Sequence, residues 1–166
     1  NCAPRYSRMV GSGFSTAAML DARDLFGLRC RITAIEPYPD RLHSVLGPQP
    51  PEEFELVVKC VQDVDVALFE QLQAGDILFV DSSHVMKIGS DVNHLVFEVL
   101  PCLRSGVIVH FHDVLYPFEY PRDWLERGFA RNEAYLLRAF LQYKNSWRIL
   151  LYNAFLGAFY RDDLIR

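Results

Sequence analysis

Chemically capable residues follow five short apolar stretches of the sequence. They are Gly11, Ser12 and Gly13 after residues 6–10, Glu36 after 31–35, Gln62 and Asp63 after 54–60, Asp81 to His84 after 77–80, and His112 and Asp113 after 107–110. If these stretches are parallel strands of one sheet, the groups meet at its carboxyl edge, where such sheets bind ligands. One strand end of this kind means little, but five in register predict a functional site.

Gly11 and Gly13 stand one residue apart, between the apolar lead Met9-Val10 and residues that can open a helix. Glycine lets the backbone approach a ligand closely, and the first helical turn presents unpaired N–H groups with a favourable dipole. The turn is therefore a predicted cradle for a small anionic or zwitterionic ligand. A Gly-x-Gly pair is also common in ordinary turns, so its meaning depends on the other strand ends.

Glu36 follows the glycine turn by roughly the 20 residues at which an acid accepts hydrogen bonds from a ribose diol in nucleotide-binding folds. Two ligands fit this spacing, a dinucleotide and S-adenosylmethionine. Thr16 stands where the dinucleotide motif G-x-G-x-x-G has its third glycine, which disfavours the dinucleotide.

The elements that must position these residues alternate between strand and helix. The apolar patterns predict parallel strands at 6–10, 31–35, 54–60, 77–80 and 107–110, helices at 15–26, 40–46, 65–73, 90–103 and 132–143, and final strands at 147–152 and 156–160. Strand–helix units with short connections predict a doubly wound α/β fold with helices on both faces. We expect a mostly parallel seven-stranded sheet that ends in an antiparallel hairpin.

The composition restricts the class of protein. A chain of 166 residues is long enough for one domain with a full core, and its net charge of −4, without a basic stripe, argues against a nucleic-acid partner. Its apolar runs are shorter than the ~18 residues of a membrane helix. The four cysteines show no C-x-x-C spacing, which is typical of a reducing cytoplasm rather than a zinc site or disulfide framework.

Four segments together resemble the class I S-adenosylmethionine-dependent methyltransferases. They are VGSGFST from Val10, IEPYP from Ile35, GDILFVDSSH from Gly75 and VHFHD from Val109. The similarity runs over essentially the whole chain and points to the small-molecule branch, close to metal-dependent sugar and antibiotic O-methyltransferases. It implies a Rossmann-like fold, a single methyltransferase-like domain over residues 1–166 without an N-terminal lid segment, and a small-molecule methyl acceptor. Whether the chain forms a homo-oligomer stays open.

The resemblance also implies how the cofactor S-adenosylmethionine would be held. Gly11, Ser12 and Gly13 would pass under its methionine part, and Glu36 would hold the ribose hydroxyls. Gln62 and Asp63 would lie beside the adenine, and Asp81 would face the methionine end or a metal. Met9 occupies the position where the family usually has an acid that helps to bind the cofactor.

In the metal-dependent relatives, an aspartate after the fourth strand and an acidic pair after the fifth hold Mg²⁺, and a histidine three residues past the first aspartate is the base. Asp81, Asp113 and His84 match that pattern, whereas His112 stands where an acid is expected. Mg²⁺ prefers hard oxygen ligands, and histidine removes both a charge and an oxygen. A divalent metal at Asp81, His112 and Asp113 could therefore also be Zn, Fe, Mn or Ni.

Methyl transfer is an in-line displacement from a sulfonium, so the enzyme positions the acceptor and removes its proton. His84, with an ordinary pKa of about 6.5, is the predicted base, with Asp81 as its catalytic partner. We predict a methyltransferase acting on a hydroxyl of a small molecule. Two alternatives stay open: a non-catalytic methyltransferase-like domain that binds a nucleotide-like ligand or a protein, and a dinucleotide-binding oxidoreductase domain.

Overall fold

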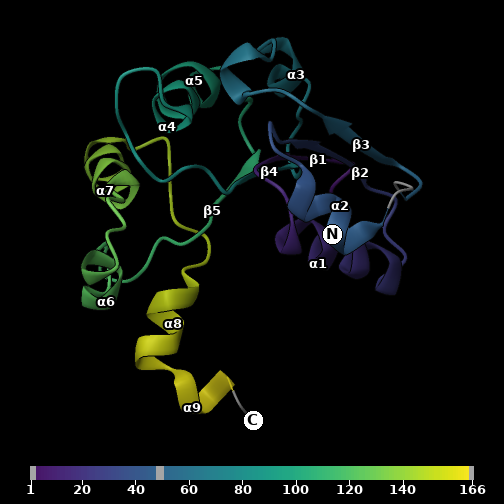
Figure 1. Cartoon of the computed structure of the whole chain (residues 1–166). Coiled ribbons are helices and arrows are strands. Elements are labelled where there is room, and N and C mark those ends of the chain that lie inside the picture. Colours follow the sequence, from purple (N-terminus) through teal and green to yellow (C-terminus); the bar gives the residue numbers. More distant parts are fainter. Residues whose placement is uncertain (1–2, 48–50, 165–166) are drawn as a thin grey trace.

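The computed structural model describes residues 3–47 and 51–164, and a parallel β-sheet forms its centre (Figure 1). Within this part of the chain the sheet consists of β1 (Tyr6–Val10), β2 (Arg31–Ile35), β3 (Phe54–Val57), β4 (Ile77–Val80) and β5 (Ile108–Phe111). The strand order is β3-β2-β1-β4-β5, and every neighbouring pair is parallel. The chain therefore reverses its direction of winding between β1 and β4, which is where sheets of this kind bind ligands.

Helices connect the strands and follow the last one. They are α1 (Phe14–Leu25), α2 (Asp40–Leu46), the 3₁₀ turn η1 (Val61–Asp63), α3 (Ala67–Glu70), α4 (Asp91–His94), η2 (Leu95–Val99), α5 (Leu100–Cys102), α6 (Arg122–Glu126), α7 (Glu133–Tyr143), α8 (Asn153–Phe159) and α9 (Arg161–Leu164). The elements α4, η2 and α5 form one helical run whose middle turn is π-helical. This run corresponds to the predicted helix 90–103.

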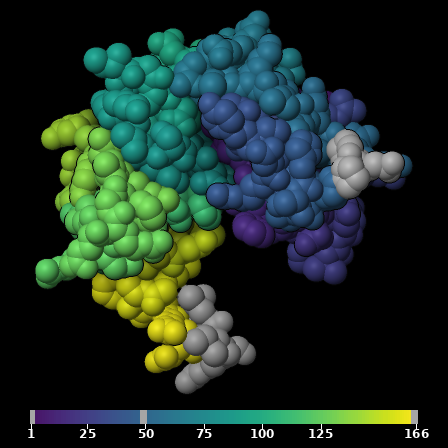
Figure 2. Space-filling model, viewed as in Figure 1, coloured from purple at the N-terminus to yellow at the C-terminus, as the bar shows by residue number. Residues whose placement is uncertain are grey.

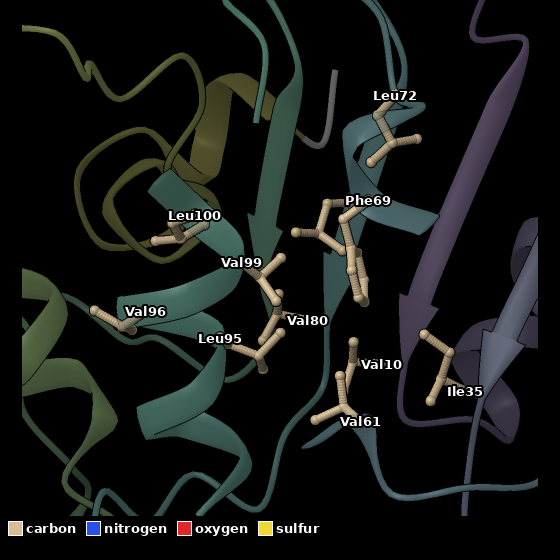
Figure 3. Packing of buried hydrophobic residues seen from close by; sticks show 11 residues of the cluster. Val10, Ile35, Val61, Phe69, Leu72, Val80, Leu95, Val96, Val99 and Leu100 are labelled. Carbon is tan, nitrogen blue, oxygen red and sulfur yellow. The ribbon is translucent and has the colours of Figure 1, made fainter. Parts of the chain in front are cut away.

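Two apolar layers cover the sheet, one on each face. Val10 and Val80 belong to the larger layer, together with Phe69 of α3 and four residues of the α4–α5 run, Leu95, Val96, Val99 and Leu100 (Figure 3). Met9, the neighbour of Val10 on β1, belongs to the other layer, where it packs with Leu20 of α1. Successive strand residues point to opposite faces, so the Rossmann-like prediction of helices on both sides holds.

Asp76 fixes the amino end of the sheet. Its carboxylate is 3% exposed and accepts hydrogen bonds from the backbone N–H groups of Arg5, Tyr6 and Gln73, each at 2.9 Å. Bonds to a buried carboxylate are charge-assisted and strong. They tie the start of β1 to the start of β4, so the carboxyl ends of these two strands come level.

The C-terminal part corrects the sequence-based prediction. In the described chain, residues 147–152 form no strand, and most of the predicted strand 156–160 belongs to α8. The sheet has five parallel strands and lacks an antiparallel hairpin, so the seven-stranded prediction is wrong for the described residues. The rings of Phe155 and Phe159, one helical turn apart, contact each other at a tilt of 43°, with centroids separated by 4.9 Å. A short apolar run such as this one fits either strand or helix, and here the helix is formed.

The C-terminal segment extends from the body of the molecule, as the yellow region of Figure 2 shows. Leu150, Leu151 and Phe159 are 65%, 69% and 59% exposed. Every residue of α8 is exposed or half-buried. Among the helices of residues 3–47 and 51–164, none has the length and apolar character needed to cross a membrane.

Candidate active site at the carboxyl ends of the strands

The hydrogen bonds of the sheet continue one residue past the strands. At four strand ends, the next backbone N–H donates to a carbonyl of the neighbouring strand at 2.8 or 3.0 Å. The residues placed in this way are Gly11, Glu36, Asp81 and His112. Predicted site residues from β1, β2, β4 and β5 therefore stand at one level on one edge of the sheet.

Gly11 allows the close approach of two of these strand ends. Its φ is +88°, and a Cβ at this position would lie 2.2 Å from the carbonyl oxygen of Asp81. Gly13 has φ of +139° and precedes the first residue of α1. Only glycine fits at position 11 without moving backbone atoms, so the turn after β1 packs directly on the end of β4.

Glu36 lies against the same turn. Its Oε2 accepts from the backbone N–H of Ser12 at 3.1 Å and contacts the Ser12 hydroxyl at 3.4 Å. Its Oε1 accepts from the backbone N–H of Tyr38 at 2.9 Å. The acid predicted to hold a ribose is thus fixed beside the glycine turn, the predicted cradle for an anionic or zwitterionic ligand.

Gln62 and Asp63 lie in η1, near this edge. Val61 in the same turn packs with Val10 and Ile35, the last residues of β1 and β2 (Figure 3). The Gln62 amide donates to the carbonyl of Gly89 at 2.9 Å, and the side chains of Gln62 and Asp63 face solvent. Among the described residues, no hydrogen bond joins Gln62 or Asp63 to the glycine turn or to Glu36.

His84 is the most buried of the titratable residues predicted for the site, at 6% exposed. Its Nδ1 lies 2.9 Å from Oε2 of Glu133, the first residue of α7. Its Nε2 lies 3.5 Å from Oδ1 of Asp81 and 4.0 Å from Oδ2 of Asp113. The predicted base thus stands among three carboxylates, one of which the sequence analysis did not single out.

This setting changes the acidity of both predicted catalytic residues. Burial lowers the pKa of His84, but its bonds to Asp81 and Glu133 outweigh burial and raise the pKa to about 9. Burial raises the pKa of Asp81, and the contact with His84 and the nearby imidazole of His112 outweigh it, so the pKa is lowered. The His84 ring therefore carries a positive charge at neutral pH.

Asp113 is paired with a cation of the protein itself. Its Oδ2 accepts from Nη1 of Arg131 at 2.6 Å, and its Oδ1 lies 3.5 Å from Nε2 of His112. The Arg131 guanidinium also lies over the ring of Trp124, 4.5 Å from its centroid. A planar, always charged guanidinium held by a carboxylate and an aromatic face is a well-defined cation.

The predicted metal ligands Asp81, His112 and Asp113 share this edge but do not form a metal site as arranged. In the described residues, no group of three or more His, Cys, Asp or Glu side chains could hold a metal ion. The positive charges of Arg131 and His84 already neutralise the two aspartates. The metal stays a prediction.

A parallel sheet wound outward from a central strand, with a glycine turn and an acid at the ends of the first two strands, defines a Rossmann-like domain. The sequence comparison narrows this class. Residues 9–114 match a family described as "Methyltransferase domain", which is well over half of the chain, and the protein belongs to this family.

Comparison with solved structures finds four matching chains. One of them, recorded as "cmcI-D160 Mg-SAM", has 21% sequence identity and a TM-score of 0.45, with 83% of this chain and 55% of that chain covered. The present chain thus spans about half the length of that protein. A comparison with curated proteins gives no match.

Two residues of the site lie beyond the family-matched range and were missed by the sequence analysis. Arg131 and Glu133 flank the start of α7, a helix that the apolar pattern predicts at 132–143. An acid in the first turn of a helix is ordinarily read as a favourable end charge, and an arginine in a loop as a solvated one. The local sequence around them carries no signal that would have assigned them to the site.

Proposed function

We propose that this chain is the catalytic domain of an S-adenosylmethionine-dependent methyltransferase that methylates a hydroxyl of a small molecule. The observation that carries the proposal is the level alignment of the glycine turn, Glu36 and Asp81 at the ends of β1, β2 and β4. All three lie in the range that matches the methyltransferase domain family.

The residues at this edge suit a zwitterionic nucleoside. The Glu36 carboxylate is held by two backbone N–H groups, and a carboxylate offers about four acceptor positions. Its contact with the Ser12 hydroxyl is long, at 3.4 Å, so a ribose hydroxyl can replace it. The N-terminus of α1 suits an anionic group, such as the carboxylate of a methionine moiety. Gln62 and Asp63 offer an amide and a carboxylate to the edge of an adenine.

Met9 departs from the family's usual acid. Its side chain is fully buried under α1 with Leu20, so it contributes packing rather than a polar contact. We therefore assign no polar contact with the cofactor to this position.

S-adenosylmethionine supplies a methyl group on a sulfonium: the carbon–oxygen bond to the acceptor forms, the carbon–sulfur bond breaks with its electron pair left on sulfur, and the acceptor proton leaves to a base. His84 is the proposed base, with Asp81 beside its Nε2. Because the pKa of His84 is raised to about 9, its neutral form is scarce at pH 7. We expect the rate of transfer to increase as the pH rises toward 9.

Calorimetric titration with S-adenosylmethionine and S-adenosylhomocysteine tests the proposal most directly. Glu36→Ala should weaken both ligands, and Glu98→Ala, which removes an exposed carboxylate from the α4–α5 run, is the matched control. His84→Ala should leave both affinities intact and slow transfer to an acceptor from a panel of small phenols and sugars. Absence of heat with either ligand would overturn the proposal.

The same titration separates the alternative function. Binding of both nucleosides without transfer to any member of the panel favours the non-catalytic binding domain. This alternative is tested because the buried Met9 stands where the family usually has an acid. The metal prediction has its own control. If neither a chelator nor Asp113→Ala changes the rate of methyl transfer, the metal prediction is wrong. If both abolish transfer, the metal prediction is supported.

A further inference from the structure

Glu133 uses both oxygens of its carboxylate to hold the loop that follows β4. It is 2% exposed, with Oε2 at 2.9 Å from Nδ1 of His84 and Oε1 accepting from the Ser82 hydroxyl at 2.8 Å. The Ser82 hydroxyl in turn accepts from the backbone N–H of His84 at 3.0 Å. A buried carboxylate is unfavourable unless its oxygens are hydrogen-bonded, so these contacts hold each other in place.

The backbones of the two segments are tied as well. The N–H groups of Asn132 and Glu133 donate to the carbonyl of His84 at 2.9 and 3.2 Å, and the Asn132 side chain accepts from the N–H of Met86 at 2.6 Å. His84 has φ of +59°, a left-handed conformation that is uncommon for residues other than glycine. Such a conformation persists where surrounding contacts fix it, and here those contacts come from the start of α7.

The contacts from Glu133 and Asn132 decide which nitrogen of the His84 ring is available. Nδ1 is directed into the protein at Glu133, whereas Nε2 is directed toward Asp81 and Asp113, whose side chains are 28% and 31% exposed. The partly open side of the site is therefore the Nε2 side.

We propose that Glu133 is a positioning residue for methyl transfer: it holds the His84 ring with Nδ1 inward, so that Nε2 is the nitrogen presented to the acceptor hydroxyl. The inference rests on the proposed function, and it assigns Glu133 no contact with substrate. A buried carboxylate that orients a histidine through one nitrogen leaves the other free to exchange a proton.

Nuclear magnetic resonance of protein with ¹⁵N-labelled histidine tests the orientation without an acceptor. His84→Ala identifies the resonance of His84 among the five histidines. We expect a downfield Nδ1–H proton that exchanges slowly with water in the wild type and is lost in Glu133→Ala. Glu133→Gln should keep it, because the amide oxygen can accept from Nδ1–H and the amide nitrogen can donate to the Ser82 hydroxyl.

Transfer rates separate positioning from charge. Glu133→Asp keeps the charge but shortens the side chain by one methylene group, so it should slow transfer on the order of 100-fold, as expected for a misplaced group. Glu133→Gln, which keeps the shape and loses the charge, should be the faster of the two. Glu133→Ala should add nothing to the effect of His84→Ala, since Glu133 acts only through that ring. Glu126→Gln, on the exposed face of α6, is the control and should match the wild type.

The outcomes distinguish this inference from the proposed function. If S-adenosylmethionine does not bind, the function fails whether or not the Nδ1–H resonance is present. If the nucleoside binds and is consumed, an unchanged resonance in Glu133→Ala, or a faster Glu133→Asp than Glu133→Gln, overturns the positioning role alone. If Glu133→Ala does not fold, the transfer rates of Glu133→Asp and Glu133→Gln test the positioning role instead.

Discussion

The family-matched region, residues 9–114, and the segment behind it, residues 115–164, differ in how they are packed. In the first, Met9, Leu78 and Val80 are fully buried in strands that pair on both sides. In the second, every residue of α6 and α8 is exposed or half-buried. The main exception is the start of α7, where Glu133 and Ala134 are buried.

That exception is the place where the second region enters the site. Glu133 reaches His84, and Arg131, two residues earlier, reaches Asp113. The first region thus supplies most of the sheet and most of the polar groups, and the second supplies Glu133 and Arg131, which contact two of those groups. The best-packed part of the second region is the part that completes the site.

Gly11→Ala should have the largest effect on stability, because in the first region the backbone of Gly11 packs directly on the backbone of Asp81. The new Cβ would lie 2.2 Å from the carbonyl oxygen of Asp81, at a φ of +88° that already disfavours a side chain. We expect the free energy of unfolding, measured by urea denaturation, to fall by about 3 kcal/mol or more. Gly27→Ala is the matched control, since its φ is +61° and its Cβ would point into open space. It should cost about 1 kcal/mol, and equal losses for the two variants would contradict the close approach at Gly11.

The contact between the two regions should make stability depend on pH. His84 faces Asp81, Asp113 and Glu133, and its pKa is raised from 6.5 to about 9 because the bonds to Asp81 and Glu133 outweigh burial. The folded state then binds the proton more tightly than the unfolded chain. The resulting stability, up to about 3 kcal/mol, is fully present below pH 6.5 and is lost as the pH rises through 9.

Urea denaturation at pH 6 and pH 9.5 measures this loss. Arg131 also lies near His84, and its positive charge lowers the pKa of His84. A variant of Glu133 is therefore needed to test the bond between Glu133 and His84 by itself. Glu133→Gln should be less stable at pH 6 and should show a smaller loss on going to pH 9.5. A variant that loses as much stability as the wild type over this range would mean that the two regions are not coupled through His84.

Gly157→Ala should have the smallest effect, because it lies in the open part of the second region. The residue is inside α8, where a Cβ would meet open space, and alanine is favoured over glycine in a helix by about 1 kcal/mol. We expect an unchanged or slightly higher free energy of unfolding and a small gain in helical circular dichroism. A loss of more than about 1 kcal/mol would show that α8 is packed more tightly than the comparison of the two regions implies.

The first region was largely predictable from the sequence. The strands 6–10, 31–35 and 77–80 and the helix 40–46 have the predicted bounds, because each is a short apolar or amphipathic run with clear turn residues beside it. The predicted helix 65–73 is shortened to Ala67–Glu70. Gln73, the last residue of the predicted helix, instead donates its backbone N–H to the Asp76 carboxylate, which also accepts from the start of β1.

The second region was not predictable to the same degree. The run 147–160 has apolar residues at both strand and helix spacing, and nothing local decides between them. In the structure, the contact between the tilted rings of Phe155 and Phe159 accompanies the helix. Tyr116 packs against both of these rings, so the choice also involves a loop that lies some forty residues earlier in the chain.

The sequence by itself determined which residue types follow each strand, and with them the glycine turn, Glu36, Asp81, His84 and Asp113. These depend on local patterns, since a parallel sheet brings the ends of its strands to one edge whatever lies elsewhere. Only the tertiary structure decided that Glu133 and Arg131 join them. His84 and Glu133 are 49 residues apart, and their contact depends on how α7 packs beside the α4–α5 run. Buried charges must find partners, and the folded chain selects them across distances that no local pattern encodes.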